Sequence, residues 1–126
     1  MKFAKITFYI AGIWGILTLS PLFFIFDNIG IKDPPAITHP LFFYGFAGVG
    51  IVWQFAFLVI ASNPARFRPL MLIAILEKLS FFVPAVILYL QQRIHPNDFF
   101  IAIPDVLLAI LFLIAYQKTP ANLQQM

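Results

Sequence analysis

The stretch LMLIAILEKLSFFVPAVILYL, residues Leu70–Leu90, is apolar over almost its whole length but carries Glu77 and Lys78 side by side. A run of about 20 apolar residues is long enough to cross the hydrocarbon core of a bilayer as a helix. A charged side chain at the centre of such a helix costs about 2.5–3.5 kcal/mol on the insertion scale. The stretch therefore predicts a transmembrane helix whose two ionisable groups point between helices rather than into lipid.

The composition of the whole chain supports this assignment. Of its 126 residues, 62% are hydrophobic and 10% are charged, and the mean hydropathy is +0.94. Soluble domains carry about 25% charged residues, and a soluble domain of this size could not bury so much apolar surface. The length predicts one integral membrane domain over residues 1–126.

Several function classes are disfavoured by what the sequence contains. It has no cysteine, which excludes disulfides, thiolate metal sites and cysteine nucleophiles. The net charge of +3 comes from cations spread over short loops, so no nucleic-acid partner is expected. No phosphate-binding, dinucleotide-binding or metal-ligand motif is present, so we expect no cofactor and no metal site.

Four segments qualify as membrane spans, at about residues 3–26, 41–62, 69–91 and 99–118. Backbone groups in lipid must be satisfied within their own segment, so these spans are predicted to be helices. Residues 27–40 (DNIGIKDPPAITHP) form the longest predicted loop, and the other connections are short. Short connections predict an all-α, up-down four-helix bundle. The basic start MKFAK could also open a signal peptide, but its apolar run is too long and no A-x-A-like cleavage site follows it.

Loop cations predict the orientation of the bundle, because Lys and Arg accumulate on the cytoplasmic side. One side would carry five of them, Lys2, Lys5, Arg66, Arg68 and Lys118, and the other side only Lys32 and Arg93. Both termini are therefore expected in the cytoplasm.

Small residues indicate the faces on which membrane helices approach each other. At spacings of three and four they form one stripe on each predicted helix, and the polar residues of the spans lie on or beside these stripes. The stripes are Ala4, Ala11, Gly15 and Thr18; Ala47, Gly50, Gln54 and Ala61; Ala74, Lys78, Phe81 and Ala85; and Ala102, Asp105 and Ala109.

The helical rise places several of these polar residues at similar depths. Glu77 and Gln54 lie roughly 12 Å from the cytoplasmic ends of their helices, and Trp14 about 16 Å. These depths predict a polar, ligand-binding layer of Gln54, Glu77 and Lys78, covered by Trp14. Asp105 enters from the opposite side, close enough to line the same cavity but not to pair tightly. Because neighbouring residues on a helix do not face each other, Lys78 or Glu77 needs another partner, and Gln54 and Asp105 are the candidates.

Structural interpretations exist for the same residues. Glu77 and Lys78 could bridge helices without any ligand, or Lys78 could extend back to the membrane surface. Gln54 could simply form a hydrogen bond across helices that helps them pack. If Pro104 occupied the first turn of a shorter fourth helix, Asp105 would be a carboxylate stabilised by the helix dipole. Pro84 predicts a kink in the third helix.

Three functions fit this pattern. The leading one is a non-catalytic accessory or binding protein, whose polar pocket holds a small amphipathic ligand, such as a lipid or quinone, or a partner helix. The second is a membrane enzyme acting on a lipid or quinone, with Glu77 as acid and base. The third is a transport subunit within a homo-oligomer or larger assembly, although the aliphatic run 106–114 argues against a polar route through one chain.

The segment THPLFFYGFAGVGIVWQFAFLVIASNPARFRPLMLIAILEKLSF (Thr38–Phe81) resembles small bacterial four-helix membrane proteins of the DoxX-like family. This resemblance implies a bacterial inner-membrane location and respiratory or redox partners, and it transfers no catalytic residues. The segment EKLSFFVP (Glu77–Pro84) is also similar to the carboxylate-then-proline pattern of the EXPERA group, which includes sterol isomerases and lipid-binding receptors. That likeness implies an intramembrane carboxylate pocket, but the histidine expected of the isomerases is missing.

Overall fold

A computed structural model describes residues 2–120 of the chain. Over these residues the chain is helical, without strands. The helices are α1 (Lys2–Leu19), η1 (Ser20–Phe23, a 3₁₀ helix), α2 (Phe26–Lys32), α3 (Pro40–Ser62), α4 (Arg68–Leu90), α5 (Pro96–Ile101) and α6 (Ile103–Lys118). Four segments are long and apolar enough to cross a membrane: Lys2–Phe23, Pro40–Ser62, Arg68–Leu90 and Pro96–Lys118. The predicted all-α fold with four spans is confirmed.

The second and third predicted spans end within a residue of α3 and α4, but the first does not extend to residue 26 as predicted. The α-helix stops at Leu19 and tightens into η1, because Pro21 has no N–H to donate to the preceding turn. The predicted loop 27–40 was also wrong in part, since α2 occupies its beginning. Asp27 lies in the first turn of α2 and Lys32 in the last, as the helix dipole favours.

The fourth predicted span, residues 99–118, is two helices in the structure. The short α5 ends at Ile101, and α6 begins after a turn at Ala102. Pro104 lies in the first turn of α6, where a missing N–H is harmless. The apolar character of the segment is continuous across this turn, which is why composition alone merged the two helices.

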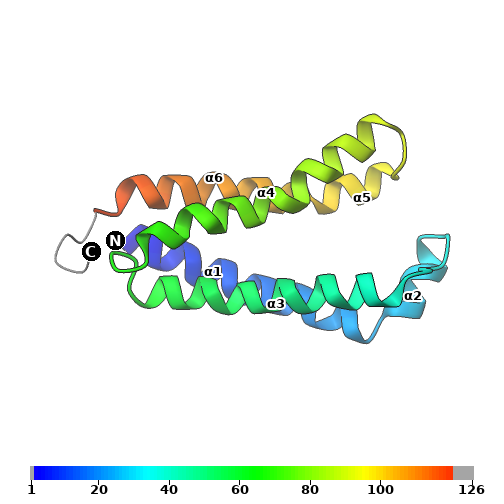
Figure 1. The fold of residues 1–126 in the computed structure, drawn as a ribbon, viewed down its shortest axis with the longest axis horizontal. Coiled ribbons are helices and arrows are strands. Elements are labelled where there is room, and N and C mark those ends of the chain that lie inside the picture. Colours follow the sequence, from blue (N-terminus) through cyan, green and yellow to red (C-terminus); the bar gives the residue numbers. More distant parts are fainter. Residues whose placement is uncertain (1, 121–126) are drawn as a thin grey trace.

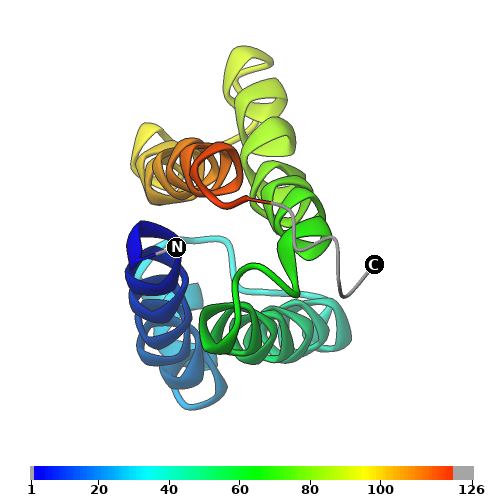
Figure 2. The same ribbon diagram turned by 90° about the vertical axis from the view of Figure 1, so that its left-hand side faces the viewer.

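The four spans form two pairs, α1 with α3 and α4 with α6, as the end-on view shows (Figure 2). Successive spans run in alternating directions along the long axis (Figure 1). The pairs lie close together at the end where α1 begins and α6 ends, and they diverge toward the end that carries α2 and α5 (Figure 1). The last turns of α4, which contains Pro84, lean away from α3.

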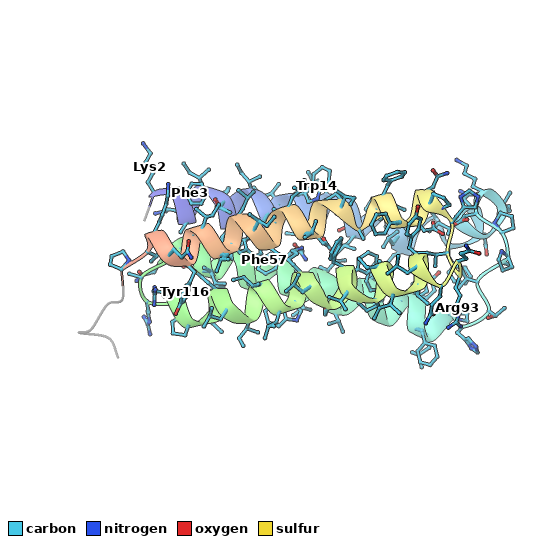
Figure 3. All side chains as sticks on the ribbon, turned by 90° about the horizontal axis from the view of Figure 1, so that it is seen from above. Lys2, Phe3, Trp14, Phe57, Arg93 and Tyr116 are labelled. Atoms are coloured by element: carbon cyan, nitrogen blue, oxygen red, sulfur yellow. The ribbon has the colours of Figure 1, made fainter. Side chains whose placement is uncertain are left out.

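The half of the bundle near the beginning of α1, which we call the core half, is tightly packed. Phe8, Phe57 and Phe112 from three helices are fully buried there. The rings of Phe8 and Phe112 stack at 4.2 Å between centroids, and Phe57 meets Phe112 edge-on at 5.1 Å. Figure 3 shows Phe57 between the helices. The largest buried side chains of the described chain thus close this half against water.

Arg68 holds the start of α4 against the end of α6. Its Nε donates to the backbone carbonyls of Tyr116, at 3.2 Å, and of Thr119, at 2.6 Å. Its guanidinium also stacks on the ring of Tyr116, with Cζ 3.7 Å from the centroid. Carbonyls at a helix end have no partner within the helix, so Arg68 satisfies them in place of water.

The outer faces of the helices are apolar. Only 22–28% of the residues in the apolar window of each span are buried inside the protein. Large side chains such as Leu17 and Val52 point outward and are more than half exposed. Each of these helices is apolar on all faces, but only one face is buried against the protein. The other faces need lipid around them, so this fold is that of a membrane protein.

Candidate intramembrane binding site

A cavity of about 530 Å³ lies in the diverging half of the bundle, which we call the cavity half. Its wall includes the second half of α1, the first half of α3, the middle of α4 and the start of α6. All five residues that the sequence singled out line it: Trp14, Gln54, Glu77, Lys78 and Asp105. The structure therefore brings them together, with at least one from each span.

A second hollow of about 440 Å³ adjoins the first, between α1 and α6. The two share Trp14, Phe46, Phe81 and Asp105 in their walls. The cavity half therefore contains two adjoining hollows where the helix pairs diverge.

Lys78 is at the centre of the polar groups. It is only 5% exposed, and its Nζ lies 3.8 Å from Oε2 of Glu77 and 3.7 Å from Oδ1 of Asp105. The same nitrogen lies 5.0 Å from the ring centroid of Phe57, at the top of the aromatic core. The ammonium is thus within ion-pair distance of two carboxylates and lies near one aromatic ring.

This geometry corrects two expectations. Asp105 was one of the two candidate partners and does pair with Lys78, although it was expected to line the cavity without pairing tightly. Glu77 was expected to face away from Lys78, yet it contacts the same ammonium. The physical reason is the four-carbon stem of lysine. It lets Nζ reach Asp105 on α6 and also lie near Glu77, the preceding residue on α4.

The sequence offered two interpretations of Asp105, a cavity-lining residue and a carboxylate at the start of a shorter helix, and the structure agrees with both. It lies in the first turn of α6 beside Pro104, where a carboxylate is favoured by the helix dipole. It also faces Lys78 in the cavity. The turn at Ala102 makes this possible, because it ends α5 and starts a new helix at this depth.

Gln54 is 1% exposed, and its amide is oriented by a hydrogen bond from Nε2 to the carbonyl oxygen of Gly50 at 2.8 Å. Because only an N–H can donate to that carbonyl, the other end of the amide is the oxygen. Oε1 is directed at Gly15 of α1, where any Cβ would overlap it. The predicted cross-helix hydrogen bond is wrong, since the bond stays within α3.

Two buried side-chain atoms of the described residues have no hydrogen-bond partner, Oε1 of Gln54 and Oε2 of Glu77. Glu77 Oε2 is within ion-pair distance of Lys78 but makes no hydrogen bond. Both atoms are acceptors and both belong to residues that line the cavity. An unpaired buried acceptor costs about 1–3 kcal/mol, so both side chains are held in this arrangement at a cost to stability.

Aromatic side chains form much of the remaining wall. Trp53, Phe46 and Phe81 line the cavity together with Trp14, whose side chain is half exposed. Sequence reasoning missed Phe46 and the role of Phe57 beneath Lys78. The signal for Phe57 was its position three residues after Gln54, on the same helix face.

Among residues 2–120, no group of three or more His, Asp or Glu side chains is placed to hold a metal ion. No protein-family model, curated protein or solved structure matches this chain. The fold is that of a small four-helix membrane protein, with a largely apolar cavity between its helix pairs into which a few polar side chains converge.

Proposed function

We propose that this protein binds a small amphipathic ligand, such as a lipid or a related isoprenoid or alkyl compound, in the cavity between its two helix pairs. The observation that carries the proposal is the meeting of five polar or amphipathic side chains from all four spans around one hollow of about 530 Å³. Ligand sites are commonly concave, largely apolar and furnished with a few convergent polar groups.

The rim of the cavity favours entry from the lipid phase. Leu41 and Phe42 line the cavity and are also 79% and 72% exposed on the outer surface of α3. In a membrane this surface faces acyl chains. A ligand dissolved in the bilayer would therefore meet the cavity without first crossing into water.

The core half favours binding over transport. The stacked rings of Phe8, Phe57 and Phe112 fill the space between the helices directly beyond Lys78. A polar route through one chain would have to pass this packing. Glu77 is engaged with Lys78 in an ion pair, which favours a role in holding a ligand over a role as acid and base.

We also propose that the protein resides in a bacterial inner membrane with both termini in the cytoplasm, where it could serve respiratory or redox partners as the DoxX-like resemblance implies. The cavity half would then face the outer leaflet. The support for the orientation is the greater number of Lys and Arg residues in the end segments and the Asn63–Phe67 connection.

Two glycines of α3 provide a test of ligand binding. Gly45 lines the cavity and Gly48 does not, and a Cβ at either position would meet no atom within 4 Å. Native mass spectrometry of the protein released from its membrane should show a co-purifying amphiphile on the wild type and on Gly48→Phe. The same adduct should be lost or strongly reduced in Gly45→Phe.

Equal adducts on Gly45→Phe and Gly48→Phe would contradict a ligand in this cavity. So would a wild-type protein without any adduct that survives mild activation. Thermal unfolding of the two variants provides the folding control, since a Cβ at either position meets no atom within 4 Å.

A further inference from the structure

We infer that the polar end of the ligand is a primary or secondary ammonium group, carried on an apolar body. This inference rests on the proposed function and specifies which chemistry the cavity selects. It follows from the formal charge of the site, from its carboxylate acceptors and from its aromatic walls.

The charges in the cavity do not balance. Among the described residues that line it, Lys78 is the single cation, whereas Glu77 and Asp105 are two carboxylates. Both carboxylates lie within 4 Å of the one ammonium. One formal negative charge is left over in a region of low dielectric constant, where it is costly unless a bound proton or a second cation compensates it. A second cation in the cavity would complete the pairing.

The hydrogen-bonding groups of the cavity also favour an ammonium ligand. The carboxylates of Glu77 and Asp105 line the cavity with side chains that are 19% and 27% exposed, and when ionised they can accept hydrogen bonds but not donate them. A ligand suited to them must bring N–H or O–H groups. An oxidised quinone brings only carbonyl acceptors and therefore fits this wall poorly.

The aromatic walls suit the same ligand. Trp14, Trp53, Phe46 and Phe81 line the cavity, and aromatic faces attract organic cations. They also supply apolar contact for the body of the ligand. An ammonium on an alkyl or aromatic body satisfies all three features of the site, as a fatty amine or an aminolipid would.

The test compares four probes on the protein in lipid nanodiscs. Each probe is an ω-bromoalkyl chain of one fixed length, ending in a primary ammonium, a trimethylammonium, a hydroxyl or a carboxylate. Bromine quenches a tryptophan that it contacts, and Trp14 and Trp53, the only tryptophans in the sequence, both line the cavity. The saturable part of the quenching therefore reports occupancy, and the linear part reports probe dissolved in lipid.

We expect the primary ammonium to bind at least about tenfold more tightly than the hydroxyl and the carboxylate, because it adds a charge-assisted hydrogen bond. It should also bind more tightly than the trimethylammonium, which carries the charge but no N–H. A hydroxyl or carboxylate probe that binds as well as the ammonium would overturn this inference and leave the proposed function standing. Quenching that does not saturate with any probe would contradict both.

A charge variant adds a second readout. Asp105→Asn should weaken ammonium binding about tenfold relative to hydroxyl binding, because it removes the excess negative charge. Asp27→Asn, on α2 outside the cavity, is the matched control and should change neither. Equal affinity of Asp105→Asn and the wild type for the ammonium would overturn the inference. The probe series on the wild type decides the question even if this variant fails to fold.

Discussion

Lys78 determines how the interior of this protein is organised. Its side chain is 93% buried, and its ammonium lies between the carboxylates of Glu77 and Asp105. The sequence predicted that these residues would face the interior, because a charge in the acyl region is costly. It named Asp105 as a candidate partner, but it did not predict that both carboxylates contact the one ammonium, since the reach of a flexible stem depends on where the neighbouring helix begins.

Replacing Lys78 by methionine tests its role. Lys78→Met keeps the stem but leaves two carboxylates close together without a cation, and we expect the protein to lose about 3–5 kcal/mol of stability. Thermal unfolding in mild detergent would measure this loss. Lys32→Met, at the exposed end of α2, is the control and should have little effect.

A double variant separates charge from packing. Asp105→Asn should cost less in the Lys78→Met background than in the wild type, because the ion pair is already absent. Strict additivity of the two losses would contradict the pairing between Lys78 and Asp105.

At the scale of elements, glycines determine how closely α1 and α3 approach. A Cβ at Gly12 would lie 2.7 Å from Cδ2 of Leu58 and 2.9 Å from the backbone oxygen of Gln54. Buried Ala4, Ala11 and Gly15 lie on the same side of α1. The small-residue stripes predicted from sequence are thus confirmed as contact faces at these positions.

Gly12→Ala should therefore separate the two helices and destabilise the protein by about 1–3 kcal/mol, the usual range for overpacking. Gly48→Ala is the matched control, because its Cβ would meet no atom within 4 Å. The measurement is the midpoint of thermal or denaturant unfolding for both variants. An unchanged midpoint for Gly12→Ala would contradict the close approach.

Element boundaries were less predictable than element identity. Hydropathy is continuous across Ser20–Phe23 and across Ala102, so composition could not show where α1 tightens or where α6 begins. Proline decided both places, at Pro21 and Pro104, because its ring restricts the preceding turn. Pro104 already indicated a shorter fourth helix as an alternative, and Pro21 is the matching signal that would have found the end of α1.

For the whole molecule, the two helix pairs create one packed half and one hollow half. Residues near Lys2 and Lys118 lie at one end, shown by the ammonium of Lys118, 4.8 Å from the ring centroid of Phe3. Arg93 lies at the opposite end (Figure 3). The proposed orientation places the first end in the cytoplasm.

Cysteine labelling tests this orientation cleanly, because the sequence contains no cysteine. A membrane-impermeant maleimide applied to intact bacterial cells should label Lys32→Cys and Arg93→Cys. Lys5→Cys and Lys118→Cys should react only after the membrane is permeabilised. The reverse pattern would invert the orientation, and labelling of Lys5→Cys and Arg93→Cys from one side would contradict the arrangement of the spans.

The sequence by itself determined that this protein is helical, that it crosses a membrane four times and that its few intramembrane polar residues face inward. These properties follow from local chemistry, because each apolar segment must satisfy its own backbone in lipid and each charge must avoid it. Only the tertiary structure decided that the helices form two diverging pairs, that Lys78 bridges Glu77 and Asp105, and that a cavity remains beside them. Those features depend on helix ends and on contacts between segments far apart in the chain, which no single segment encodes.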